Sequence, residues 1–175
     1  MKNKLAFWQI GGFVFTGITG TLLHFLYDWS DKSPFVALFS AVNESIWEHM
    51  KLLFAPLLIF ALFESRFLKN KYPNFWCSKL FGTLLGLLVI PTLYYTYTGA
   101  FGVNADWFNI TIYFFSAAVV FFAEWIFIKN RFKCLLSPTL SLIVLLLIGL
   151  TFILLTFFPI HIPLFQDPLS KLYGI

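Results

Sequence analysis

The sequence predicts an all-α fold, a polytopic transmembrane bundle of five helices. Of its 175 residues, 59% are hydrophobic and 11% are charged, whereas a soluble domain carries about 25% charged residues. Five apolar segments are each long enough to cross a hydrocarbon core, which takes about 20 helical residues. All six tryptophans fall at or near the ends of these segments, where indole rings meet lipid headgroups. We therefore expect a single transmembrane domain over residues 1–175.

The five segments are expected to be helices because backbone polar groups inside a bilayer must be hydrogen-bonded within the segment itself. The first segment follows a basic start, as in a signal peptide. It runs on to Tyr27 without a small-residue cleavage site, which predicts an uncleaved span. The third is interrupted by Pro91. The predicted spans cover about residues 8–27, 46–67, 80–98, 107–128 and 135–158, and a tail of residues 161–175 follows.

Two shorter segments adjoin the second and fifth spans. The stretch DKSPFVALFSAV is too short to cross, so it predicts either a loop or a short interfacial or re-entrant helix that begins near Pro34. Pro159 and Pro163 end the fifth helix. The tail is too short to span and too apolar to extend freely into water, so we expect it to fold back over the outer face.

The distribution of basic residues predicts the orientation. Nine of the 12 Lys and Arg residues lie on the side of the N-terminus, and such an excess marks the cytoplasmic side. We expect a multi-pass protein of the cell membrane whose N-terminus is cytoplasmic. Cys77 and Cys134 then lie near the cytoplasmic face, where thiols stay reduced, and no disulfide is expected. The net charge of +4 is spread over short clusters, which argues against nucleic-acid binding.

Ionisable residues gather on the predicted outer side. All three histidines and six of the eight acidic residues fall there, and only Glu64 and Glu124 lie near the inner side. Glu124 is expected at the inner headgroup level. Ionisable groups inside a membrane are costly, need partners and mark functional sites. The sequence therefore predicts one shared polar pocket at the outer face, built by the first two spans and the tail.

The stretch NESIWEHMK supplies most of this pocket. A helix turns about 100° per residue, so Glu44, Glu48 and Lys51 share one face, with Ser45 and His49 beside them. On the first span His24 and Asp28 are four residues apart and share a face. The tail would bring further polar groups to the same place. The remaining pocket candidates are Asn43, Trp47, His161 and Asp167.

A purely structural interpretation covers part of this stretch. Ser45-x-x-Glu48 matches a capping box at a helix start, Asn43 can also cap, and Trp47 can anchor the helix at the interface. Lys51 can be the partner of Glu48. This interpretation does not explain why Lys51 lies about two turns into the span, nor why His49 lies beside it, so a functional pocket is favoured.

Three motifs carry a resemblance to known families. HFLYDW, NESIWEHMK and PLFQDPLSKLYGI together resemble a family of small bacterial membrane proteins of unknown function, which implies a five-span bundle and no established activity. The chain is more loosely similar to the alkaline-ceramidase and adiponectin-receptor class of membrane hydrolases. Those hold zinc with a Ser-x-x-x-His element, an aspartate and a late His-x-x-x-His pair. Ser45-x-x-x-His49 and Asp28 match the first two parts, whereas His161 has no histidine four residues on.

These observations favour a metal-dependent hydrolase that acts on a lipid or another amphiphile. Zinc would be held by two or three of His24, His49 and His161 and by a carboxylate, for which Asp28 is the candidate, with a position open for water. Glu44 or Glu48 would be the general base, and Lys51 would stabilise developing negative charge. A binding or transport module and a structural subunit of a membrane complex are the alternatives. The sequence identifies no protein partner.

Overall fold

The computed structural model describes residues 2–131 and 133–175 and shows an all-helical bundle. Within these residues five helices are long and apolar enough to cross a membrane, and no strand is found. The predicted fold class is therefore confirmed. The long helices are α1 (Lys2–Trp29), α2 (Ile46–Leu68), α3 (Phe75–Phe101), α4 (Asp106–Lys129) and α5 (Pro138–Phe157).

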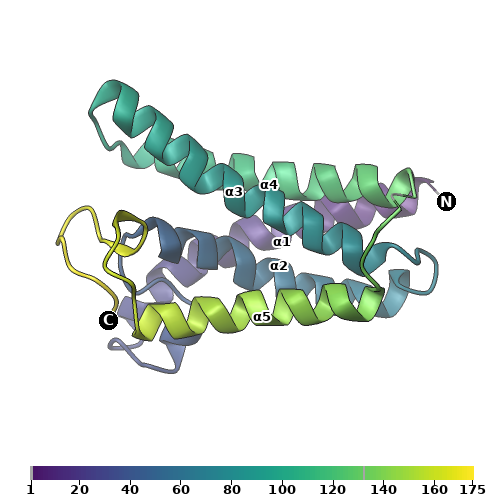
Figure 1. Ribbon diagram of the computed structural model, residues 1–175, viewed down its shortest axis with the longest axis horizontal. Coiled ribbons are helices and arrows are strands. Elements are labelled where there is room, and N and C mark those ends of the chain that lie inside the picture. Colours follow the sequence, from purple (N-terminus) through teal and green to yellow (C-terminus); the bar gives the residue numbers. More distant parts are fainter. Residues whose placement is uncertain (1, 132) are drawn as a thin grey trace.

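The helices run along the long axis of the molecule, and the N- and C-termini lie at opposite ends (Figure 1). We call the end that holds residues 158–175 the tail end, and the opposite end the N-terminal end. At the tail end, α3 and α4 lean away from the other three helices. Pro91 does not interrupt α3, which continues to Phe101 and stops at Gly102, a residue with a φ of 68°. Glycine adopts this left-handed conformation without steric cost.

The outer surface of the bundle is apolar, as a lipid-facing surface requires. Large hydrophobic side chains are exposed on every long helix, among them Ile18, Phe63, Leu88, Phe122 and Leu147. On α5 the buried residues are limited to Ser141, Leu145, Phe152 and Thr156. The polar side chains therefore have to be sought in the interior and at the two ends.

Two glycines let α3 and α4 approach closely. A Cβ atom on Gly82 would lie 2.5 Å from the Cγ atom of Glu124, and one on Gly86 would lie 2.2 Å from a methyl carbon of Val120. Gly82 and Gly86 are four residues apart, the small-residue spacing that packs membrane helices against each other. This close packing buries the side chain of Glu124 between the two helices.

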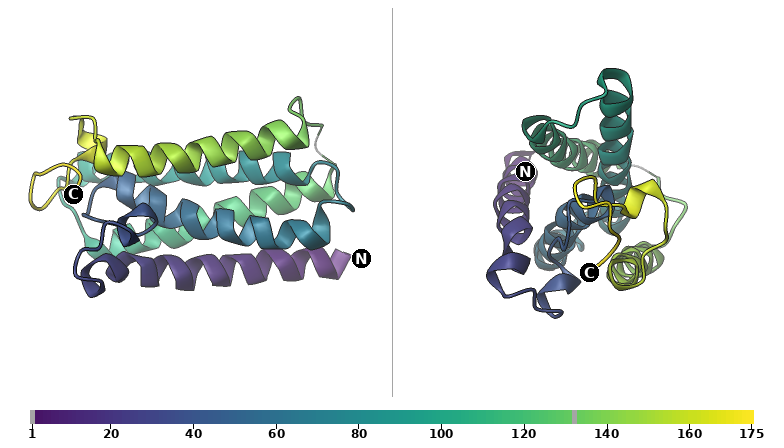
Figure 2. Two further views of the ribbon diagram at one scale, coloured as in Figure 1. Left: turned by 90° about the horizontal axis from the view of Figure 1, so that it is seen from below. Right: turned by 90° about the vertical axis from the view of Figure 1, so that its left-hand side faces the viewer.

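The tail folds over one end of the bundle, as the sequence predicts. Its short helix η2 (Pro163–Phe165) places the ring of Phe165 with its centroid 4.7 Å from that of Trp47. The Asn43 amide donates a hydrogen bond of 2.9 Å to the carbonyl oxygen of Gly174. Seen from the tail end, the tail crosses the ends of the helices (Figure 2). A second short helix, η1 (Val36–Leu38), precedes α2.

The two cysteines correct one prediction, because Cys77 and Cys134 form a disulfide with their Cα atoms 6.2 Å apart. The expectation of free thiols rested on their position at the predicted cytoplasmic face. The α4–α5 connection, however, passes over the start of α3 and brings Cys134 to Cys77. The disulfide lies at the N-terminal end and links two segments that are 57 residues apart.

We expect a Cys77–Cys134 peptide in tryptic digests of protein whose free thiols were blocked before lysis. Cys134→Ser should lower the free energy of unfolding by about 2–4 kcal/mol, because the cross-link no longer restricts the unfolded chain. Mass spectrometry and thermal unfolding in detergent measure the two effects. Wild-type protein reduced with dithiothreitol is the control. Complete alkylation of both cysteines in the blocked sample would show that they are reduced in the cell and would contradict the disulfide.

Candidate metal centre

The start of α2 is fixed by side-chain hydrogen bonds. The Ser45 hydroxyl accepts a bond of 3.4 Å from the backbone N–H of Glu48, and the Asn43 side-chain oxygen accepts one of 2.9 Å from the N–H of Ser45. The predicted cap is therefore present. Half of the capping box is missing, because the Glu48 carboxylate turns inward and accepts from the N–H of Val42 instead. The cap holds residues 43–45 in one conformation and sets the direction of the Glu44 side chain.

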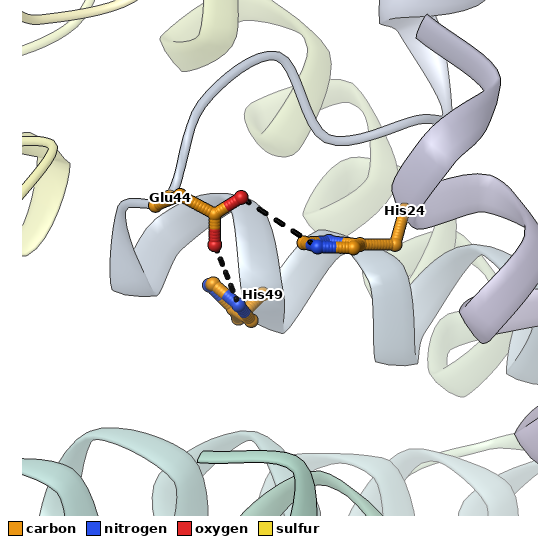
Figure 3. Close-up of side chains that lie close together, drawn as sticks. All are labelled: His24, Glu44 and His49. Atoms are coloured by element: carbon orange, nitrogen blue, oxygen red, sulfur yellow. Dashed lines mark ion pairs between the residues drawn. The ribbon is translucent and has the colours of Figure 1, made fainter. Parts of the chain in front are cut away.

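Three side chains from separate segments meet beside this cap (Figure 3). His24 comes from α1, Glu44 from the loop before α2, and His49 from the first turns of α2. The Nε2 atom of His24 lies 3.5 Å from one Glu44 carboxylate oxygen, and the Nε2 atom of His49 lies 3.6 Å from the other. One ligand atom from each residue lies within 4.8 Å of the others. The carboxylate therefore stands between the two imidazole rings.

The spacing of these atoms fits a shared metal ion. A direct hydrogen bond would bring the nitrogen and oxygen to about 2.7–3.2 Å, and both Glu44 distances are longer than that. Zinc in a tetrahedral site has bonds of about 2.0–2.2 Å, which puts neighbouring ligand atoms about 3.4 Å apart. Two histidines and one glutamate form the ligand set of a catalytic zinc site that keeps one position open.

The orientation of His49 also favours a cation. Its Nδ1 atom lies 2.9 Å from the carbonyl oxygen of Ser45, to which it can only donate. In the neutral ring the Nε2 atom then has no hydrogen, and its lone pair faces the carboxylate of Glu44. Two acceptors in this arrangement repel each other unless a proton or a metal ion lies between them. Metal-binding histidines are commonly held in this way by a carbonyl on the other ring nitrogen.

The three side chains line a cavity of about 490 Å³. Its walls come from α1, α2 and α4, and Leu169 of the tail covers part of it. Two further polar side chains of α4, Asp106 and Asn109, face the same space. The apolar part of the wall consists of Phe25, Leu52, Ile110, Tyr113, Phe114 and Leu169.

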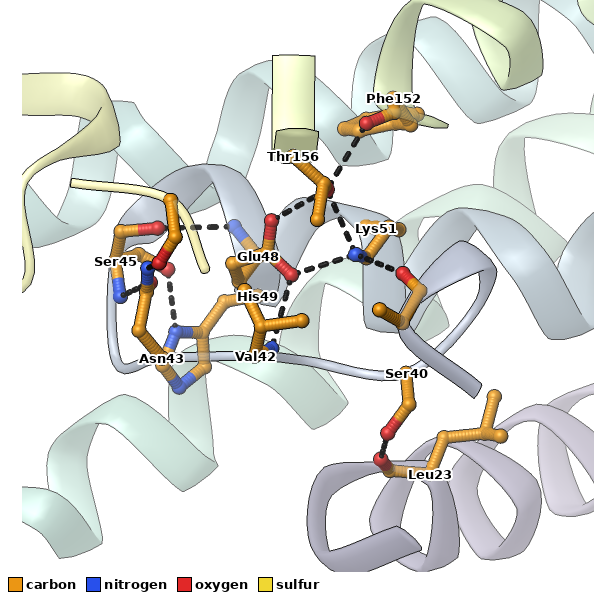
Figure 4. Close-up of polar contacts among 12 residues, drawn as sticks. Leu23, Ser40, Val42, Asn43, Ser45, Glu48, His49, Lys51, Phe152 and Thr156 are labelled. Atoms are coloured by element: carbon orange, nitrogen blue, oxygen red, sulfur yellow. Dashed lines mark hydrogen bonds and ion pairs between the residues drawn. The ribbon is translucent and has the colours of Figure 1, made fainter. Parts of the chain in front are cut away.

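Glu48 and Lys51 are placed elsewhere, in a closed pair inside the bundle (Figure 4). Their side chains are 2% and 1% exposed, and the Lys51 Nζ atom lies 2.6 Å from a Glu48 oxygen. The ammonium also donates to the Ala37 carbonyl at 2.9 Å and to the Thr156 hydroxyl at 2.8 Å. All three N–H groups of the ammonium are thus used. The pair has no access to the cavity, where the sequence placed a general base and an anion-stabilising lysine.

The structure does not bring the other predicted ligands to the group. His161 is exposed and its ring packs against Tyr173, with centroids 4.7 Å apart. Asp28 is exposed at the end of α1 and does not belong to the His24, Glu44 and His49 group. The ligand set therefore changes from the one predicted, because Glu44 takes the place given to Asp28 and His161.

Trp47 and Asp167 hold the tail instead of lining the cavity. The Trp47 ring lies between Phe152 and Phe165, with centroids 4.5 and 4.7 Å away. The Asp167 carboxylate accepts hydrogen bonds from the N–H of Leu169 at 2.7 Å and the hydroxyl of Ser170 at 2.8 Å. Both residues thereby position Leu169 over the cavity.

Asp106 and Asn109 line the cavity but were not among the pocket residues expected from the sequence. Asp106 is the first residue of α4, where an acid favours the helix dipole. The Asn109 amide donates to Asn104 at 2.8 Å and accepts from the Tyr97 hydroxyl at 2.5 Å. The sequence did contain a signal for this placement, because Asp106 and Asn109 are three residues apart and therefore lie on one face of α4.

The fold and the site together define a class, a five-helix bundle of the membrane type with a His/Glu/His group suited to a metal ion. Within that class the chain belongs to a family described as "Family of unknown function (DUF6512)", whose model matches residues 1–175. No curated protein and no solved structure matches the chain.

Proposed function

We propose that the protein is a metal-dependent hydrolase of the cell membrane that acts on a lipid or another amphiphile. The observation that carries the proposal is the placement of Glu44 between His24 and His49 at the wall of a large cavity. With the predicted orientation, this site opens toward the outer leaflet.

The ligand set supports zinc as the metal. His24 and His49 would bind it through their Nε2 atoms, and Glu44 through its carboxylate. A zinc ion held by these residues would lower the pKa of a bound water molecule toward neutrality and so provide a nucleophile. Ser45 contributes through its carbonyl oxygen, which orients His49, and through its hydroxyl, which caps α2. The Ser-x-x-x-His element, which resembles that of the alkaline-ceramidase class, would thus have a supporting role here.

The cavity supports an amphiphilic substrate. One part of its wall is polar and holds the metal ligands with Asp106 and Asn109, and the other is formed by aliphatic and aromatic side chains. An acyl chain could pack against Phe25 and Phe114 while an ester or amide carbonyl lies at the metal ligands. Burial of apolar chain atoms there contributes about 0.8 kcal/mol per CH₂ group.

Asp106 is the acidic side chain that supports proton transfer, because Glu44 is a ligand and Glu48 is closed off. In the proposed reaction a water oxygen forms a bond to the substrate carbonyl carbon, and the Asp106 carboxylate accepts the proton that the water loses. The bond to the leaving oxygen or nitrogen then breaks, and Asp106 gives the proton to that atom. The products are a carboxylic acid and an alcohol or amine.

We expect zinc-dependent hydrolysis of 4-methylumbelliferyl heptanoate by the purified protein in lipid nanodiscs. Asp106→Asn should lower kcat by a factor of about 10²–10⁴ with little effect on KM, because the side chain acts only in proton transfer. Fluorescence of the released alcohol measures both constants.

Asp31→Asn is the matched control, because Asp31 is exposed outside the cavity. EDTA should abolish the reaction and added zinc should restore it. Zinc binding without turnover of the ester would refute a hydrolase and leave a metal-binding module. Equal rates for Asp106→Asn and the wild type would refute the role of Asp106.

A further inference from the structure

A second cluster of buried charged groups lies near the N-terminal end, away from the candidate metal centre. Glu64 from α2, Lys79 from α3 and Glu124 from α4 are 0%, 2% and 1% exposed. The Lys79 Nζ atom lies 2.5 Å from a Glu64 oxygen and 2.6 Å from a Glu124 oxygen. Each residue lies about one turn inside the end of its helix, so the cluster is within the three membrane-spanning helices α2, α3 and α4.

The charges of this cluster do not balance. Two ionised carboxylates and one ammonium leave one negative charge in a place that water does not reach. An uncompensated charge of this kind costs several kcal/mol. The rings of Phe60, Phe75 and Phe121 surround the Lys79 ammonium, with centroids 5.5 to 5.9 Å away. The groove between α1 and α4 beside Gln9 is lined almost entirely by apolar side chains.

Among the side chains that the structure describes on the packed helices, no other charged group compensates the excess charge. From α1 the cluster receives the uncharged amide of Gln9, and α5 contains no titratable residue. The nearest basic residues on α2 and α4, Arg66 and Lys129, are exposed. The balancing positive charge therefore has to be an ion that the cluster itself binds.

Gln9 indicates what this ion is, because its side-chain amide lies between the two carboxylates and is 6% exposed. In one orientation its nitrogen lies 3.4 Å from Glu64, and its oxygen faces the oxygens of Glu124 and Phe121. In the other orientation its nitrogen donates to Glu124 at 3.2 Å and to the Phe121 carbonyl at 3.1 Å. The second orientation satisfies the nitrogen better, and the amide oxygen then faces a Glu64 oxygen.

In either orientation the amide oxygen of Gln9 meets a carboxylate oxygen. Two acceptors attract each other only when one of them carries a hydrogen. With the favoured orientation that hydrogen is on Glu64, which donates to Gln9, while the Glu124 carboxylate accepts from Gln9 and Lys79. Lys79 contacts both carboxyl groups at nearly equal distances, so it is Gln9 that assigns the proton.

We propose that Glu64, Lys79, Glu124 and Gln9 form a proton-binding site that holds one proton, carried by Glu64. With this proton the cluster has one negative and one positive charge and no net charge. The site is separate from the candidate metal centre and does not depend on the proposed hydrolase. Buried carboxyl groups of this kind bind and release protons in membrane proteins.

Infrared spectroscopy of the full-length protein in nanodiscs at pH 7 tests the proposal. We expect the C=O stretching band of a protonated carboxylic acid, which shifts in D₂O. Glu64→Gln should remove the intensity of one carboxyl group per chain. Glu124→Gln should remove it as well, because Glu64 then becomes the ionised partner of Lys79. Asp31→Asn, which changes an exposed acid, should leave the band unchanged.

Three results would overturn the proposal. The first is a wild-type spectrum from which Glu64→Gln removes no carboxylic-acid intensity. The second is a wild-type protein that shows no carboxylic-acid band and has a higher melting temperature in NaCl than in choline chloride, provided that Glu64→Gln removes this difference in melting temperature. That result would mean that a sodium ion takes the place of the proton. Retention of the band in Glu124→Gln would contradict the charge balance on which the proposal rests.

Discussion

Lys51→Met is expected to destabilise the protein by about 3–5 kcal/mol, the typical effect of removing one partner of a buried ion pair. The variant leaves the Glu48 carboxylate 2% exposed without a counter-ion, and it leaves the Ala37 carbonyl without its donor. A whole domain is stable by only about 5–15 kcal/mol. Thermal or SDS-induced unfolding in detergent measures the change.

Two variants make the test specific. Lys4→Met removes an exposed lysine of α1 and should change the stability by less than about 0.5 kcal/mol. The double variant Glu48→Gln/Lys51→Met removes both charges and should recover part of the loss, which also covers the case in which Lys51→Met does not fold. A loss for Lys51→Met no larger than for Lys4→Met would contradict the closed pair.

His49→Ala is expected to lower the affinity for zinc by at least about 100-fold, since even outer-shell partners of a metal contribute 10–100-fold. The variant removes one of three ligands and leaves His24 and Glu44 3.5 Å apart without the third. Competition with a chromophoric zinc chelator in detergent measures the affinity.

His161→Ala is the matched control for this prediction, because His161 is exposed and lies outside the group. It should bind zinc as the wild type does. Melting temperatures recorded in EDTA show whether both variants fold. Equal zinc affinities of His49→Ala and the wild type would contradict the assignment of the ligands.

The helices were predictable from the sequence because the length of an apolar run is a local property. A run of about 20 apolar residues has one favourable structure in a bilayer, the helix. The tail was predictable for a similar reason, since Phe165 and its neighbours need an apolar surface. The disulfide was not, because the approach of Cys134 to Cys77 depends on the path of the α4–α5 connection.

The candidate metal centre was predictable in part. His24, Glu44 and His49 were among the residues expected in one pocket, and they meet because α1 packs against α2. The sequence offered Glu44 and Glu48 alike as a general base, so the separate placement of the two side chains was not predictable. Glu44 and Glu48 are four residues apart and were expected on one face. The contacts of Glu48 with Val42, Lys51 and Thr156 hold its side chain inward.

The cluster of Glu64, Lys79 and Glu124 was not predictable from the sequence either. Glu64, Lys79 and Glu124 lie near three different predicted span ends, where each alone resembles an ordinary headgroup contact. Glu124 was expected at that level, but it is 1% exposed. The small residues at Gly82 and Gly86 were the local signal that α3 and α4 approach closely there.

The central claim, that His24, Glu44 and His49 bind one metal ion together, is tested most directly by zinc K-edge X-ray absorption on the purified protein loaded with one equivalent of zinc. We predict two imidazole nitrogens and oxygen ligands at about 2.0–2.2 Å, and one imidazole fewer in His24→Gln. A zinc shell without imidazole, or a protein that retains no zinc after desalting, would contradict the claim.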